Sequence, residues 1–132
     1  MNITPENITS LKEDEVFVFG SNLRGLHGAG AARQAIQFGA IMGNPNGYQG
    51  QSYAIPTKDY QIHTLPVVRI KRYVDEFIRV TRIMPSKKFL VTAIGCGLAG
   101  LTPEDIAPLF RGAVDLPNVW LPESFWKVLN PS

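Results

Sequence analysis

Residues 20–32 read GSNLRGLHGAGAA, and this glycine-rich stretch decides the fold. It directly follows the apolar run VFVF at 16–19 and leads into alanine-rich sequence, so it indicates a strand, a loop and the start of a helix. Glycines let the backbone take positive φ values and come close to a ligand, and the first N–H groups of a helix have no partner inside the helix. Proteins use this combination to hold phosphate.

A second stretch repeats the arrangement. The apolar run FLVTAI at 89–94 leads into GCGLAG at 95–100, after which Thr102 and Pro103 begin another helix. Two such junctions indicate one diphosphate held between two loops. Residues 95–100 also match the dinucleotide fingerprint G-x-G-x-x-G. That fold needs a further strand–helix–strand unit and an acid after its next strand, and residues 101–132 are too few for it. A role of these glycines in tight turns alone is the other interpretation.

Strand-like and helix-like segments alternate along the chain. The expected strands are 16–19, 51–56, 89–94 and 118–121, and the expected helices are 30–38, 66–84 and 103–112. Residues 1–15 form a polar lead-in, 43–50 a surface loop rich in turn formers, and 125–129 a tail packed on the body.

This order predicts the α/β class, with one domain over 1–132. We expect a three-layer α/β/α fold with a mixed, mostly parallel central sheet. Ligands of such sheets bind beyond the carboxyl ends of the strands. Both glycine loops and Lys58, which follows the strand at 51–56, should therefore meet at one cleft.

Composition narrows the class of protein. Hydrophobic residues make up 45% and charged residues 18%, which is typical of a globular protein, and the net charge of +2 does not by itself indicate a nucleic-acid partner. The single cysteine, Cys96, can form neither an internal disulfide nor a thiolate zinc cluster, so we expect a reducing compartment. No leader and no stretch of membrane-spanning length is visible, which predicts a cytoplasmic protein without a membrane partner.

Four side chains near the loops have alternative roles. Asn22 suits either a turn cap or a contact with a ribose hydroxyl. His27 lies between glycines, where we expect solvent exposure or a phosphate or ribose contact rather than burial, whereas His63 suits a structural role. Cys96 is better explained as a small packed residue than as a nucleophile, because no histidine or asparagine close in sequence would activate it.

The helix at 66–84 supports a second hypothesis of a different class. It and the residues after it carry a run of cations: Arg69, Lys71, Arg72, Arg79, Arg82, Lys87 and Lys88. Such a run is more often a solvated face than a nucleic-acid site, and no aromatic residues interleave with it to stack bases. The alternative function is a small nucleic-acid or protein-interaction module that uses this basic helix, with the glycine loops as turns.

Taken in order, the motifs resemble the macrodomain superfamily of ADP-ribose-binding α/β/α modules. Gly20-Ser21-Asn22 with the glycine-alanine-glycine loop at 28–30 looks like that family's first loop, and the Ile-Gly-Cys-Gly-Leu sequence at 94–98 looks like its second phosphate-binding loop. The branch of terminal ADP-ribose protein glycohydrolases is most similar, because it has these loops and a Thr-Lys pair in the same order. The resemblance covers about residues 16–110.

The resemblance implies a ligand and a set of contacts. The partner would be ADP-ribose or an ADP-ribosylated macromolecule, with nucleic acid only as a modified substrate, and no cofactor or metal is expected. Which carrier holds the ADP-ribose, and whether the protein is a monomer, stay open. The expected ligand-binding residues are Gly20, Ser21, Asn22, His27, Gly28, Ala29, Gly30, Ala31, Ile94, Gly95, Cys96, Gly97 and Leu98.

Catalysis is less well supported than binding. In the similar enzymes a lysine, matched here by Lys58, attacks the distal ribose, and an aspartate just after the second loop assists it. Ala99 occupies that position and cannot transfer a proton. Asp59 and His27 are the candidate substitutes, so glycohydrolase activity is an open question.

The acid that usually contacts the adenine is not assigned by the motifs. Asp14 and Glu15 precede the first strand, and either of them is a candidate.

Overall fold

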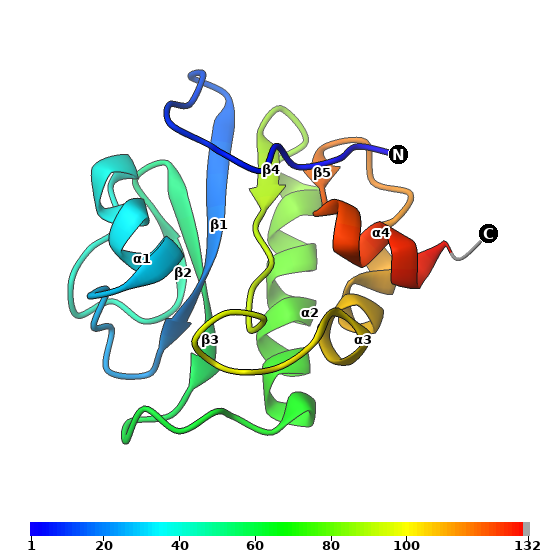
Figure 1. Cartoon of the computed structure of the whole chain (residues 1–132). Coiled ribbons are helices and arrows are strands. Elements are labelled where there is room, and N and C mark those ends of the chain that lie inside the picture. Colours follow the sequence, from blue (N-terminus) through cyan, green and yellow to red (C-terminus); the bar gives the residue numbers. More distant parts are fainter. Residues whose placement is uncertain (131–132) are drawn as a thin grey trace.

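A five-stranded sheet forms the centre of the molecule, a computed structural model that describes residues 1–130. The strands are β1 (Glu15–Asn22), β2 (Gly47–Gln49), β3 (Ser52–Lys58), β4 (Lys88–Val91) and β5 (Val119–Trp120). Their order is β2-β3-β1-β4-β5, and β2 alone runs antiparallel to its neighbour. Figure 1 shows β1 at the centre of this mixed, mostly parallel sheet, as predicted.

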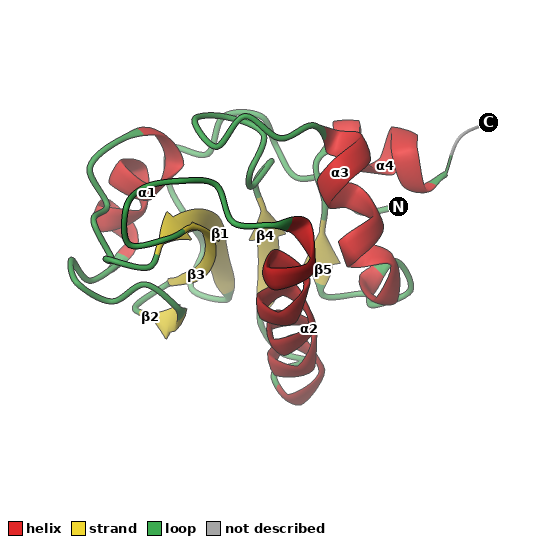
Figure 2. Ribbon diagram, turned by 90° about the horizontal axis from the view of Figure 1, so that it is seen from below, coloured by secondary structure: helices red, strands yellow, loops and turns green. Residues whose placement is uncertain are grey.

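Helices cover both faces of the sheet, which gives three layers. The helical segments are α1 (Gly30–Ala35), η1 (Ile36–Phe38), α2 (Val67–Ile83), α3 (Pro103–Ile106), η2 (Ala107–Ala113) and α4 (Glu123–Leu129). Figure 2 looks onto the carboxyl ends of β1, β3 and β4 and shows α1 and α2 on opposite sides of the sheet. The segments α3, η2 and α4 pack at the β5 end. The predicted three-layer α/β/α fold is confirmed.

The uniformly apolar sequence of β1 is explained by burial on both faces. Val16 and Val18 join the core that α2 covers, whereas Phe17 and Phe19 join a smaller core beneath α1. Each of these four side chains is at most 1% exposed. A central parallel strand covered by helices on both sides needs no alternation of polar residues.

The loop expected at 43–50 contains a short strand that was not predicted. Residues 47–49 form β2, which pairs antiparallel with β3 through Gly47–Ala54 and Gln49–Ser52. Gly50, with φ +62°, makes the tight turn between the two strands. A strand of three residues at the edge of a sheet is too short to show a recognisable apolar pattern. The surrounding turn formers therefore led to the prediction of a loop.

Two strand ends also differ from the prediction. β3 does not stop at Pro56 but continues to Lys58. This is possible because the pairing of β3 with β2 ends at Ala54, so no neighbouring strand needs the N–H that Pro56 lacks on that side. β4 ends at Val91 rather than at Ile94. The next residues turn away along the cleft described below.

The helix expected over 103–112 is present in two parts. It begins at Thr102 as predicted, and Thr102 and Asp105 form a capping box, in which the Thr102 hydroxyl accepts from the Asp105 N–H and the Asp105 carboxylate accepts from the Thr102 N–H. The α-helical part then ends at Ile106 and continues as 3-10 turns, because Pro108 has no N–H for the next α-helical bond.

The lead-in at 1–15 and the last helix, α4, both contact the body. The predicted polar lead-in is bonded to the chain just after β5, since the Thr4 N–H donates to the Leu121 carbonyl at 2.9 Å and Ile3 pairs with Leu121. Phe125 and Trp126 of α4 are buried, as expected for a packed tail. Within residues 1–130, no helix has the length and apolar character needed to span a membrane.

Candidate functional site

A cleft of about 750 Å³ lies at the carboxyl ends of β1, β3 and β4. It is lined by residues 20–22, 28–32, 57–58 and 92–99, together with Leu26 and Ile62. Figure 2 views the molecule from this side, where the loops that follow the three strands come together. Every residue predicted to bind the ligand lines the cleft except His27.

The loop between β1 and α1 is shaped by its own side chains. The Asn22 amide oxygen accepts from the N–H groups of Arg24 and Leu26 at 3.2 and 3.1 Å, and the amide nitrogen donates to the Leu26 carbonyl. Of the two roles considered for Asn22, these bonds support the turn. Gly25 is required by packing, because its φ is +68° and an added Cβ would lie 2.4 Å from the Gly43 carbonyl carbon.

This loop then presents bare backbone to the cleft. Residues 28–30 are exposed, and within residues 1–130 no group accepts a hydrogen bond from the N–H of Gly28 or Ala29. The first turn of α1 has no side-chain cap either. Ser21 differs from the expectation, since its buried hydroxyl donates to the Pro45 carbonyl and its own carbonyl accepts from the Thr57 hydroxyl at 3.2 Å.

The loop between β4 and α3 likewise contains one glycine that the fold requires and backbone N–H groups that are left unbonded. Gly95 has φ +75°, with an added Cβ 3.2 Å from the Ile106 side chain, so its glycine is needed for the turn. Gly97 has neither a positive φ nor any neighbour within 4 Å of an added Cβ. In the described chain no acceptor is bonded to the N–H of Gly97 or Leu98. These donors are therefore available to a ligand.

The charge of the cleft comes from Lys58. This half-buried residue ends β3, and its carbonyl accepts from the Leu23 N–H at 2.9 Å. It makes no ion pair within residues 1–130, and no carboxylate is among the residues that line the cleft. A lysine and unpaired backbone N–H groups both favour an anion.

The expectation for His27 is wrong. Its side chain is 1% exposed and lies outside the cleft, where Nε2 is 3.1 Å from the Asn44 carbonyl oxygen and the ring packs edge-on against Phe19 at 5.2 Å between centroids. The side chain therefore packs against the smaller core, to which Phe19 belongs. No feature of the local sequence distinguishes this from the exposed arrangement.

Asp59 is not positioned as a substitute acid. Its carboxylate accepts from the N–H groups of Gln61 and His63 at 2.8 and 2.9 Å, and it does not line the cleft. The pKa of Asp59 is lowered, mainly because the His63 N–H donates to the carboxylate. The His63 side chain itself is exposed, so the structural role expected of this residue belongs to its backbone.

Cys96 lines the cleft as a protonated thiol. Burial raises its pKa to about 11, and the nearby Asp105 and Glu104 carboxylates add to the effect. A reactive cysteine has a lowered pKa. The side chain packs against the core that α2 covers, which supports the packed role.

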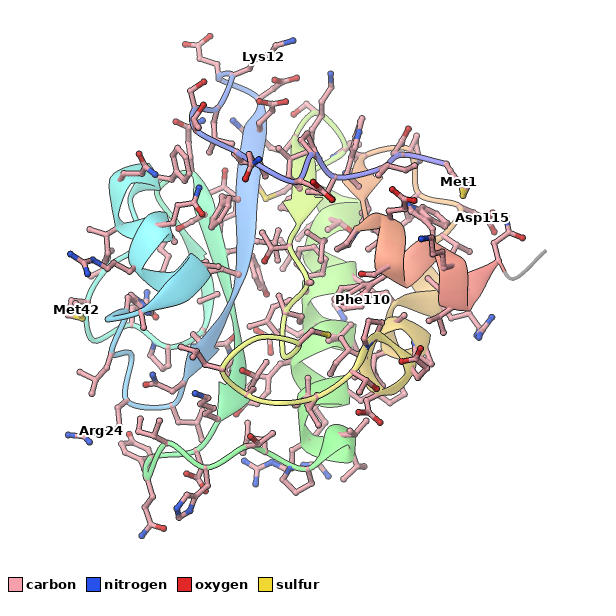
Figure 3. All side chains as sticks on the ribbon, viewed as in Figure 1. Met1, Lys12, Arg24, Met42, Phe110 and Asp115 are labelled. Carbon is pink, nitrogen blue, oxygen red and sulfur yellow. The ribbon has the colours of Figure 1, made fainter. Side chains whose placement is uncertain are left out.

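The candidate adenine acids lie at the wrong end of the sheet. Asp14 is 3.9 Å from the Lys88 ammonium, and the Glu15 carboxylate accepts from the Lys12 N–H at 2.8 Å. Lys12 and Arg24, labelled in Figure 3, mark opposite ends of the molecule, with Arg24 in the loop beside the cleft. Neither acid can reach a ligand held at the carboxyl ends of the strands.

A second hollow adjoins the cleft and was not foreseen. It has a volume of about 630 Å³ and shares Thr92 and Ala93 with the cleft. Its walls come from the lead-in at 3–6, from Ile8, Phe17 and Gln34, and from the start of α4 at 122–124. Only the chain's fold brings these distant segments together, and no motif in any of them signals the hollow.

The cations of α2 are exposed and mixed with acids. Lys71 pairs with Asp75 at 2.8 Å, and Glu76 is exposed on the same helix. Arg82 donates to the Gly112 carbonyl at 3.4 Å. This arrangement is typical of a solvated helix face.

No protein-family model, curated protein or solved structure matches the chain. Among residues 1–130 no group of three or more histidine, cysteine, aspartate and glutamate side chains could hold a metal ion.

Proposed function

We propose that the cleft binds ADP-ribose or a related nucleotide diphosphate, as the proteins of the macrodomain superfamily that the motifs resemble do. The observation that carries this proposal is the pairing of two loops with unbonded N–H groups across a cleft whose charged lining residue is Lys58. An added Cβ on Gly30 would lie 4.0 Å from the Leu98 side chain, so the two loops are close enough to contact one diphosphate.

Gly28 and Gly97 support a ligand rather than a turn. Neither has a positive φ, and an added Cβ at either would meet nothing within 4 Å. The fold therefore does not require glycine at these two positions. A ligand that hydrogen-bonds the backbone closely does require it, and a diphosphate is such a ligand.

The second hollow offers room for the nucleoside. It continues from the cleft at Thr92 and Ala93, and its walls combine the apolar Ile8 and Phe17 with polar groups of the lead-in and α4. The Thr4 hydroxyl oxygen is buried there without a partner in the described chain, and Glu6 and Glu123 are the acids of this hollow. These two carboxylates replace Asp14 and Glu15 as candidates for an adenine contact.

We propose binding with little or no glycohydrolase activity. Lys58 is the one group of the cleft that matches a catalytic residue of the similar enzymes, and Ala99 stands where their acid would be. Asp59 and His27 lie outside the cleft, and the Cys96 thiol is protonated at neutral pH. General acid–base catalysis needs a titratable group within hydrogen-bond reach.

Calorimetry with ADP-ribose, AMP and NAD tests the proposal. We expect ADP-ribose to bind, and Lys58→Ala to weaken the binding because the diphosphate loses its cation. Lys71→Ala is the matched control, since this lysine lies on α2 and pairs with Asp75. The absence of a measurable heat of binding with ADP-ribose at high micromolar protein would refute the proposal.

The alternative of a basic-helix interaction module has its own outcome. If Arg72→Glu and Arg79→Glu abolished retention of the protein on RNA or DNA at moderate salt, while ADP-ribose did not bind, the macrodomain interpretation would be abandoned. A nucleic-acid site would lose affinity through its lost phosphate contacts.

A further inference from the structure

The turn that follows β3 contains a strained residue that faces the cleft. Ile62 has φ +64°, and it is the only residue other than glycine with a positive φ among residues 1–130. A β-branched side chain disfavours this left-handed conformation strongly. Such strain persists only where the surrounding structure enforces it, and it is frequent at ligand sites.

Asp59 enforces this conformation. Its carboxylate accepts from the N–H groups on both sides of Ile62, and its own N–H donates to the His63 carbonyl at 2.7 Å. The Ile62 N–H donates to the Asp59 carbonyl at 3.1 Å. Residues 59–63 therefore form a closed turn that leaves Ile62 no extended alternative.

The turn is also tied to the opposite loop of the cleft. The Thr64 hydroxyl donates to the Ala99 carbonyl at 2.6 Å, and the Leu65 N–H donates to the Thr57 carbonyl at 2.8 Å. Both ends of the turn are thus anchored. The position of Ile62 relative to the loop at 95–99 is fixed before any ligand arrives.

Ile62 is one of three large aliphatic residues that are exposed in the cleft. Leu26, Ile62 and Leu98 come from the loops after β1, β3 and β4, and they are 44%, 39% and 74% exposed. They share the cleft with Lys58, its one charged lining residue. Aliphatic surface of this kind gains by contact with an uncharged group, whereas a charge placed against it loses solvation.

We infer that Asp59 and Ile62 determine the specificity of the cleft. Asp59 closes the turn, and the turn holds Ile62 as an aliphatic wall next to the position of the diphosphate. This wall selects a ligand with an uncharged sugar beyond the diphosphate over a ligand with a further phosphate there. This inference rests on the proposed function. The diphosphate already carries more negative charge than Lys58 neutralises, so a third phosphate would meet aliphatic side chains without a second cation. The preferred ligands are nucleoside diphosphates that end in a sugar.

The test compares ADP-ribose with ATP, which differ in the group beyond the diphosphate. We expect the protein to bind ADP-ribose at least about tenfold more tightly than ATP, and Ile62→Asn to remove most of this ratio. Asparagine tolerates the left-handed conformation, so this variant keeps the turn while replacing the aliphatic wall with an amide. Asp59→Asn keeps an acceptor oxygen and should keep the ratio, whereas Asp59→Ala should lose it.

Ile36→Asn is the matched control. Ile36 is 40% exposed, close to the 39% of Ile62, but lies outside the cleft with φ −57°. Thermal unfolding should show Ile62→Asn at least as stable as the parent and Ile36→Asn less stable, because only the first change relieves strain. An unchanged ratio in Ile62→Asn, with ADP-ribose still bound, would overturn the specificity inference alone. Failure of the parent protein to bind ADP-ribose would overturn the proposed function and this inference with it.

Discussion

Replacing Gly97 with alanine should strengthen the fold and weaken ligand binding at the same time. The position has no positive φ, and the added methyl meets no protein atom within 4 Å. Alanine then reduces the freedom of the unfolded chain without straining the native state. We expect about 0.4 to 1 kcal/mol of added stability, and a rise in the melting temperature of about 1 to 4 °C.

The effect on binding has the opposite sign. A phosphate oxygen bonded to the Gly97 N–H would lie about 2.9 Å from that nitrogen, so a methyl on the adjacent Cα crowds it. Loss of one hydrogen bond to a charged group costs about 1.5 to 3 kcal/mol, which is about a 10- to 150-fold loss of affinity for ADP-ribose. Calorimetry and thermal unfolding on the same preparation measure both quantities.

Gly112→Ala supplies the control for this experiment. Gly112 lies in η2 with no positive φ, and its added Cβ would make an ordinary 3.7 Å contact with Ile78. This variant should bind ADP-ribose as the parent does. If Gly97→Ala also bound normally, the backbone of the second loop would not contact the ligand. If it were instead destabilised, the glycine would have a structural role that we have not recognised.

Three further predictions concern titratable groups and the proposed chemistry. The pKa of Asp59 is lowered in the folded state, so its contribution to stability is present above the pKa of the unfolded chain and lost as the pH falls through the folded pKa; acid unfolding of Asp59→Ala should lack this component, and identical pH profiles would contradict the closed turn. Since burial raises the pKa of Cys96 to about 11, alkylation by iodoacetamide at pH 8 should be much slower than that of a free thiol such as glutathione, and equal rates would show that the thiol is not packed. The parent protein should not release ADP-ribose from glutamate, serine or nucleic-acid linkages; rapid release that Lys58→Ala abolished would contradict the binding-only proposal, and no gain in Ala99→Asp would weaken the match of Ala99 to the catalytic acid.

The parts of the fold that could be predicted depend on local signals. β1 and α2 carry long runs whose apolar pattern matches their burial, and the Thr102 capping box satisfies the backbone within a few residues of itself. The strand β2 gives no such signal, because its three residues are defined by pairing with β3. The end of β4 was missed for a related reason, since Thr92–Ile94 are apolar enough for a strand but follow the cleft wall instead.

The position of the site's backbone loops could be predicted from the sequence, whereas the orientation of several of its side chains could not. The glycine spacing and strand order located both loops and Lys58 in one cleft, which follows from the general geometry of parallel sheets. The burial of His27 depends on contacts with Phe19 and with the Asn44 carbonyl. Both residues lie outside the glycine-rich segment around His27, so the local sequence does not reveal these contacts. The role of Ile62 depends on its φ angle, and the sequence between Asp59 and Leu65 contains no glycine that would have indicated a left-handed residue.

The most direct test of the central claim is a titration of the ¹⁵N-labelled protein with ADP-ribose, followed by NMR of the backbone amides. The claim is that N–H groups of both glycine loops bind one diphosphate. We therefore predict saturable shifts at residues 28–31 and at Gly97 and Leu98, with the same dissociation constant, while the amides of α2 beyond its first turn stay in place. Shifts confined to α2, or to one loop only, would contradict the account.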